Sequence, residues 1–239
     1  MAAARRVRRT RDRVAAPRRV RSPRGAYNGA MTEHVILLHG VWMRGLTLLS
    51  LARRLRAAGF SVDVFDYASV FGDATRTYER LRTRMRESGA DRVHLVGHSL
   101  GGIVALEATR KADDLPRGHI VCLGPPLRGS SVARVLSHVP GGRWLLGTNR
   151  GTLIEGVKRW NGSRPVGVVA GELPFGLGVS IGALTAPHDG TVAVEETRLG
   201  GVTDHRTVAA THTGLLFSST VAELTIGFLR DGRFATAAR

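Results

Sequence analysis

The stretch that most constrains the fold of this chain is Leu95–Gly102, which reads Leu-Val-Gly-His-Ser-Leu-Gly-Gly. The apolar run at 93–96 is typical of a central parallel strand, and residues 102–112 have the apolar spacing of a helix. The segment 97–101 fits Gly-x-Ser-x-Gly, in which a serine sits on a sharp strand-to-helix turn and the glycines remove side chains that would collide. This context predicts that Ser99 is a nucleophile. The competing interpretation is a serine that only caps the helix.

A second match to the same pattern lies at residues 178–182, around Ser180. Only Ala-Leu-Thr-Ala separates it from Pro187, which is too short a stretch for the helix that the turn requires. The pattern therefore favours Ser99 over Ser180.

A serine hydroxyl becomes a good nucleophile only when a base takes its proton, and that base is usually oriented by a carboxylate. In the fold that carries such a turn, the acid and then the histidine follow the serine, each in a loop after a later strand. The sequence places Asp189, in an Asp-Gly turn, and His212 after the two later strand candidates. We therefore predict Asp189 as the orienting acid and His212 as the base, although Asp189 could also serve an ordinary turn.

Other residues compete for these two roles. His188 adjoins the predicted acid, and His205 lies ahead of the last predicted strand, at the wrong end of the sheet. Three carboxylates are near enough in sequence to replace Asp189, but each is interpreted as a solvated charge: Glu195, Glu196 and Asp204.

An acyl-transfer site also needs N–H donors for the oxyanion, normally the amide after the nucleophile and one from the loop after the first core strand. Val35–Leu38 is fully apolar, and His39-Gly40-Val41-Trp42 follows it. The backbone amides of Val41 and Leu100 are the predicted donors. The alternative for His39 and Gly40 is a tight turn before a helix.

In this order and spacing, His39-Gly40, the Ser99 turn, Asp189-Gly190-x-Val192 and His212 resemble the alpha/beta-hydrolase superfamily, and more narrowly its small bacterial lipases and esterases. The resemblance covers about residues 33–230. It implies a three-layer α/β fold with a mostly parallel sheet of about six strands, flanked by helices and without a large cap domain.

The resemblance also implies a Ser99, Asp189, His212 triad, an oxyanion hole from Val41 and Leu100, and cleavage of small-molecule or lipid carboxylic esters without a cofactor. The segment Pro125–Ser130 resembles a stretch that lines the site in lipase-like members. Residues 139–160 could form a short cap over an acyl pocket, or could equally pack into the core. The substrate-lining candidates are Trp42, His98, Leu127 and Trp144.

Alternating apolar patterns predict the elements of one domain over residues 31–239. The expected strands are 34–38, 62–65, 93–97, 119–123, 166–170 and 207–210, and the expected helices are 45–58, 74–88, 101–112 and 214–230. The 239-residue chain has no apolar span of the ~20 residues that cross a membrane.

Residues 1–30 differ in composition from the rest, with ten arginines and one aspartate that supply +9 of the formal net charge of +16. No apolar signal-peptide core follows the arginines, so we expect a disordered extension, with Met31 as a candidate true start. The alternative is a basic arm that binds nucleic acid or an anionic membrane surface. No aromatic residues are interleaved with these arginines, and nucleic acid is not the expected partner.

The single cysteine, Cys122, lies in a predicted strand and cannot form an internal disulfide, which suits a reducing cytoplasm. No His, Cys and carboxylate cluster has metal-ligand spacing, so no metal is expected. Three rival functions remain: an acyltransferase or a thioesterase with the same triad, and a non-catalytic binding protein on a hydrolase scaffold.

Overall fold

The computed structural model describes residues 31–176, 179 and 182–235. Its centre is a six-stranded parallel sheet in the order β2-β1-β3-β4-β5-β6. The strands are β1 (Glu33–Leu38), β2 (Ser61–Phe65), β3 (Arg92–His98), β4 (Ile120–Leu123), β5 (Val166–Gly171) and β6 (Asp204–Val208). Because all strands run the same way, their carboxyl ends meet at one edge of the sheet.

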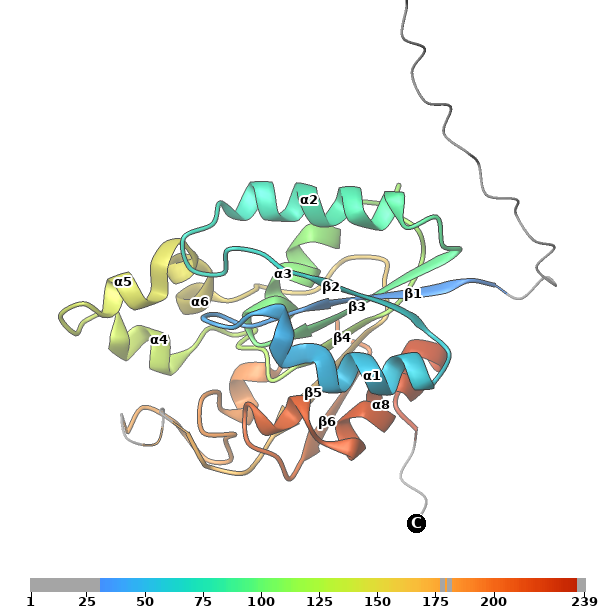
Figure 1. Ribbon diagram of the computed structural model, residues 1–239. Coiled ribbons are helices and arrows are strands. Elements are labelled where there is room, and N and C mark those ends of the chain that lie inside the picture. Colours follow the sequence, from blue (N-terminus) through green and yellow to red (C-terminus); the bar gives the residue numbers. More distant parts are fainter. Residues whose placement is uncertain (1–30, 177–178, 180–181, 236–239) are drawn as a thin grey trace, which may run out of the picture. The chain divides into compact units, whose positions relative to one another are not determined.

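Helices cover both faces of this sheet (Figure 1). The four longest are α1 (Leu49–Ala57), α2 (Ala74–Glu87), α3 (Leu100–Thr109) and α8 (Ser219–Asp231). Figure 1 shows α2 and α3 on one side of the sheet and α1 and α8 on the other. The three-layer α/β fold predicted from the sequence is therefore confirmed.

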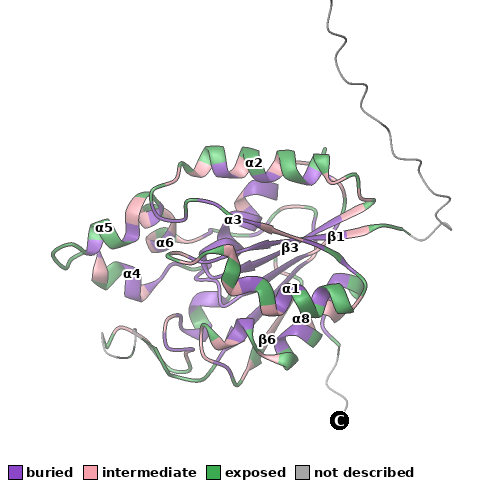
Figure 2. Cartoon of the chain, viewed as in Figure 1, coloured by how far each residue is buried: buried purple, intermediate pink, exposed green. Residues whose placement is uncertain are grey.

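The alternation of side chains along each strand divides the core into two clusters. In β1, Ile36 and Leu38 pack with the cluster under α2 and α3, while Val35 and Leu37 pack with the cluster under α1 and α8. β1 and β3 are therefore buried along most of their length, as Figure 2 shows. Burial on both faces explains their continuous apolar sequence.

The last strand departs from the prediction, since β6 spans Asp204–Val208 and not 207–210. β6 is one of the two edge strands and pairs only with β5, from Gly167 opposite Asp204 to Gly171 opposite Val208. An edge strand buries less surface, so its sequence, Asp-His-Arg-Thr-Val, lacks the apolar run used to place the other strands.

Two predicted helices begin as short 3-10 turns. The first comprises η1 (Gly45–Leu48) and α1, and the last comprises η4 (Gly214–Leu216) and α8. The predicted helix is interrupted before α8, because the Ser218 hydroxyl accepts the N–H of Val221 and caps the start of a new helix there.

Between β4 and β5 the chain forms α4 (Ser131–Leu136), α5 (Gly142–Leu146), η2 (Gly147–Asn149) and α6 (Arg150–Glu155), and η3 (Val194–Thr197) lies before β6. Residues 139–160 were expected either to cap an acyl pocket or to pack into the core. Leu146 and Trp160 are buried in the core, whereas Trp144 and Leu145 are exposed. Within the described residues, no helix is both long and apolar enough to cross a membrane.

Candidate active site

Ser99 stands between β3 and α3 with backbone angles φ 53° and ψ −121°, a region that non-glycine residues rarely adopt. A side chain on Gly97 would collide with the backbone of Gly101, and one on Gly101 would collide with the Leu38 carbonyl. The Ser99 N–H donates to the Leu123 carbonyl at 2.8 Å, which ties the turn to the end of β4. The two glycines and this hydrogen bond hold Ser99 in its strained conformation.

The loop after β1 lies against this turn. A Cβ on Gly40 would stand 3.2 Å from the Ser99 Cβ, so glycine permits the close approach. The buried His39 ring stacks on Tyr67 at 4.5 Å between centroids, and the Tyr67 hydroxyl donates to the His39 carbonyl at 2.7 Å. Trp42 has a positive φ of 58°. Within the described residues, the N–H groups of Val41 and Leu100 donate no hydrogen bond.

Asp189 and His212 lie together at the carboxyl edge of the sheet. Asp189 is buried, and its Oδ1 accepts the N–H groups of Thr191 at 2.9 Å and Val192 at 2.7 Å. Its Oδ2 lies 2.7 Å from Nδ1 of His212, and its carbonyl accepts the His212 N–H at 2.8 Å. A carboxylate can only accept, so His212 Nδ1 is the donor and the Nε2 of the neutral ring is left with a free lone pair.

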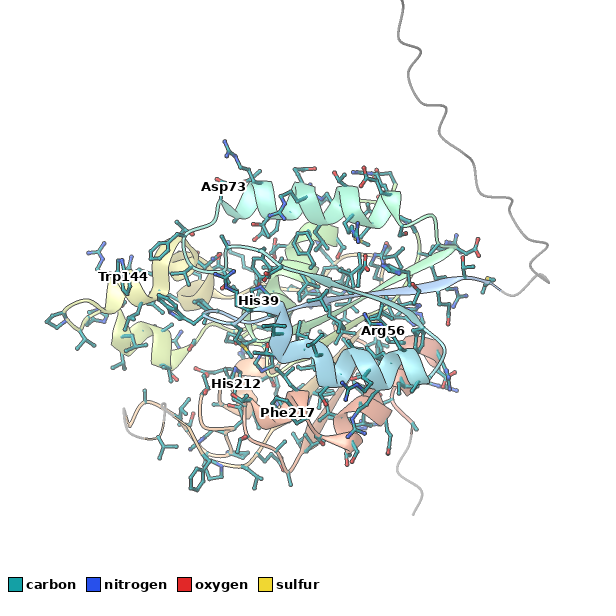
Figure 3. All side chains as sticks on the ribbon, in the orientation of Figure 1. His39, Arg56, Asp73, Trp144, His212 and Phe217 are labelled. Carbon is teal, nitrogen blue, oxygen red and sulfur yellow. The ribbon has the colours of Figure 1, made fainter. Side chains whose placement is uncertain are left out.

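The structure brings Asp189 and His212, the predicted acid and base, into contact, but it does not show a contact between His212 and the Ser99 hydroxyl. Within the described residues, no hydrogen bond joins the Ser99 hydroxyl to His212. The two parts of the site adjoin through His98, the residue before Ser99, whose ring centroid is 4.6 Å from that of His212. Figure 3 shows His212 on the α8 side of the sheet and His39 nearer its middle.

A sequence model described as "Alpha/beta hydrolase family" matches residues 35–174, more than half of the chain. The protein belongs to this family. No curated protein matches its sequence.

The most informative structural neighbours of this alpha/beta hydrolase share its fold at low sequence identity. A Bacillus licheniformis lipase, BlEst2, in its propeptide form has a TM-score of 0.71 at 18% identity, with 87% of this chain and 52% of the lipase covered. The chain thus spans about half the length of that lipase. A marine microorganism esterase has a TM-score of 0.57 at 16% identity, with 84% of this chain and 97% of the esterase covered. The Vlm2 thioesterase domain has a TM-score of 0.55 at 14% identity, with 87% of this chain and 95% of that domain covered.

His98 was predicted to line the substrate site, and the structure instead buries its ring against His212. Its side chain is buried, and Nε2 donates to the His212 carbonyl at 2.9 Å. Burial, together with the nearby His212, lowers the pKa of His98 to about 3, so the ring is neutral at ordinary pH. Its Nδ1 has no hydrogen-bond partner in the described part of the chain.

Leu127 also departs from the prediction that it lines the site. It is fully buried in the core cluster under α2 and α3, and its carbonyl accepts the Val157 N–H at 2.6 Å. An apolar residue in a Pro-rich loop can either line a site or anchor the loop to the core. Leu127 anchors the loop to the core.

Trp42 and Trp144, the other two substrate-lining candidates, are both exposed. The indole Nε1 of Trp42 donates to the Leu145 carbonyl at 2.8 Å, which joins the loop after β1 to α5. Beside Trp42 is an open groove of about 440 Å³, lined by residues 42–44, 66–71 and 80. That these two indoles line the substrate site stays a prediction.

The competing acids and histidines are engaged elsewhere. His205 lies within β6, near its amino end, and its Nε2 is 2.7 Å from the Thr197 hydroxyl. Glu196 was interpreted as a solvated charge, and this was wrong: it is buried and accepts the N–H groups of Ser131 and Ala193. Glu195 is exposed and pairs with Arg128. Ser180 lies outside the described residues.

Sequence reasoning missed Gly124, which has a φ of 57°. A Cβ there would stand 3.0 Å from Nδ1 of His212 and 3.1 Å from Oδ2 of Asp189. A glycine directly after the strand that neighbours β3 is the signal that could have identified it. The described residues contain no cluster of three His, Cys or carboxylate groups able to hold a metal.

Proposed function

We propose that the protein is a serine hydrolase that cleaves carboxylic esters through Ser99, His212 and Asp189. The observation that carries this proposal is the 2.7 Å contact between Asp189 and His212 beside the strained Ser99 turn. Asp189 is buried and held by two amides, so it orients the ring and leaves His212 Nε2 free to act as a base.

In the first half of the reaction, His212 Nε2 takes the Ser99 proton while the serine oxygen attacks the ester carbonyl. The carbonyl oxygen becomes an oxyanion. The N–H groups of Val41 and Leu100, which have no partner in the described structure, are the proposed donors to it. The carbon–oxygen bond to the alcohol then breaks, and the protonated His212 returns its proton to the leaving alcohol.

In the second half, water attacks the acyl-enzyme with His212 again acting as the base, and the carboxylic acid leaves as Ser99 regains its proton. This chemistry needs no cofactor.

We also propose that residues 31–239 form the catalytic domain, of which residues 1–30 are not a part. We propose in addition that the protein acts in the cytoplasm. The buried single Cys122 is compatible with that compartment.

The proposal is tested by hydrolysis of p-nitrophenyl esters of increasing acyl length. We expect Ser99→Ala to lower kcat/KM by about 10³-fold or more while the variant stays folded. Ser180→Ala, in the second Gly-x-Ser-x-Gly match, is the matched control and should leave kcat/KM unchanged. Equal hydrolysis by the wild type and Ser99→Ala would overturn the proposal.

The same assay with added alcohol acceptors, analysed by mass spectrometry, separates hydrolysis from acyl transfer. The free acid should remain the main product. A dominant transesterification product would keep the triad but change the reaction to that of an acyltransferase.

A further inference from the structure

Three aromatic rings form an exposed cluster beside the site, which we call the aromatic patch: Trp42, Phe71 and Trp144. Their centroids are 5.6 Å apart for Trp42 and Trp144, 5.6 Å for Phe71 and Trp144, and 6.3 Å for Trp42 and Phe71. Yet they are 52%, 57% and 62% exposed. Rings that pack on one another but stay open to solvent are typical of a surface that binds a partner.

The patch is built from three separate segments. Trp42 lies in the loop after β1, Phe71 lies between β2 and α2, and Trp144 lies on α5 with the exposed Leu145 next to it. The hydrogen bond from the Trp42 indole to the Leu145 carbonyl fastens two of these segments together. The patch is therefore a preformed surface.

Basic side chains adjoin the patch. Arg44 and Arg80 line the same groove as Trp42 and Phe71, and the exposed Arg143 precedes Trp144. None of the three forms an ion pair in the described part of the chain. Asp66 is the one carboxylate that lines the groove, and its Oδ1 is 2.8 Å from Nε2 of His39. Unpaired guanidinium groups beside aromatic rings complement a surface that is apolar within and anionic outside.

We propose that the aromatic patch docks the protein on an anionic lipid surface, with the rings entering the boundary between headgroups and acyl chains. Trp42 directly follows Val41, so docking brings the Ser99 site to the lipid. This inference rests on the proposed function in one respect, because it names lipid esters as the substrate class. Surface binding itself requires no catalysis.

The chain suits a fluorescence test, since its three tryptophans are Trp42 and Trp144 in the patch and the buried Trp160. The full chain is titrated with phosphatidylglycerol vesicles and with phosphatidylcholine vesicles. We expect a blue shift of tryptophan emission and co-sedimentation with phosphatidylglycerol, and weaker binding to phosphatidylcholine. The preference should shrink at 0.5 M salt, where the Debye length falls to about 4 Å.

The patch is then tested by Phe71→Ala and Trp144→Ala, alone and together. Trp42 is left intact because it adjoins a proposed oxyanion donor. The double variant should bind phosphatidylglycerol vesicles about tenfold more weakly or worse, given the apolar area removed. Phe217→Ala is the matched control: Phe217 is 54% exposed and lies apart from Trp144 in Figure 3.

Unchanged binding by the double variant would overturn the proposal and assign the affinity to another basic part of the chain. An equal loss with Phe217→Ala, or equal binding to both lipids, would also overturn it. Ser99→Ala, measured in parallel, should bind vesicles like the wild type. Vesicle binding without ester hydrolysis would contradict only the proposed function, and hydrolysis without vesicle binding would contradict only this inference.

Discussion

His98 donates a hydrogen bond of 2.9 Å from Nε2 to the backbone carbonyl of His212. The residue beside the proposed nucleophile thus fixes the backbone of the proposed base. Because burial lowers the pKa of His98 to about 3, its ring keeps a single N–H, and that N–H is used in this contact.

His98→Leu removes this donor and should displace His212 from the position that its contact with Asp189 defines. A lost hydrogen bond is worth about 1 kcal/mol, so we expect kcat to fall about fivefold with KM little changed. His98→Gln, which keeps an N–H near the same point, should recover part of the loss. A purely structural role for His98 would lower the melting temperature of both variants without this split between kcat and KM.

Gly124→Ala tests the packing between the end of β4 and the acid–base pair. The new Cβ would stand 3.0 Å from His212 Nδ1 and 3.1 Å from Asp189 Oδ2, so the pair must move and kcat should fall strongly. The positive φ adds about 1 kcal/mol of destabilisation. Gly59→Ala is the control, since Gly59 also has a positive φ, of 96°, but a Cβ there meets nothing within 4 Å. Gly59→Ala should lower the stability of the protein without lowering kcat.

Tyr67→Phe tests the support of the loop after β1. It removes the 2.7 Å hydrogen bond to the His39 carbonyl and keeps the ring that stacks on His39. Burial raises the pKa of Tyr67, so the hydroxyl remains a donor at all ordinary pH values. We expect a loss of about tenfold in kcat, equivalent to about 1.4 kcal/mol, because the loop carries a proposed oxyanion donor. Tyr78→Phe should keep the wild-type kcat, since the Tyr78 hydroxyl donates no hydrogen bond to another described residue.

The stability of the protein should fall in mild acid, in part because of His94. Burial, reinforced by the nearby His119, Arg164 and Arg92, lowers its pKa from 6.5 to about 3. Between these values the unfolded chain binds a proton that the folded chain does not, so the free energy of unfolding falls as the pH drops below 6.5. The slope from His94 is at most about 1.4 kcal/mol per pH unit.

The His94 contribution is measured from melting temperatures between pH 7 and pH 5. His94→Asn keeps an acceptor for the His119 N–H, which now donates to His94 Nδ1 at 3.0 Å, but cannot titrate. Its melting temperature should depend less on pH than that of the wild type. His138→Asn, at an exposed position, should retain the full slope. An undiminished slope in His94→Asn would show that other groups cause the acid sensitivity.

The sequence predicted the features that depend on local rules. The Ser99 turn follows from glycines that no other residue could replace, and the central strands follow from burial on both faces. The pairing of Asp189 with His212 followed from their order along the chain, because the loops after parallel strands meet at one edge of the sheet. Val41 and Leu100 as oxyanion donors remain a prediction.

The features that the sequence missed depend on tertiary contacts. β6 was placed too late because an edge strand needs no apolar run. His98 and Leu127 lie in a site-like motif, but their direction is set by the packing of α3 and of the loop after β4. Phe71, Tyr67 and Gly124 act through residues far away in the chain, and no local spacing indicates which ring or carbonyl each will meet.

The most direct test of the account is labelling by a fluorophosphonate probe, which reacts only with an activated serine, followed by mapping of the modified peptide. The prediction is labelling of the wild type and of Ser180→Ala at Ser99, and no labelling of Ser99→Ala. An unlabelled wild type, or labelling that persists in Ser99→Ala, would contradict it.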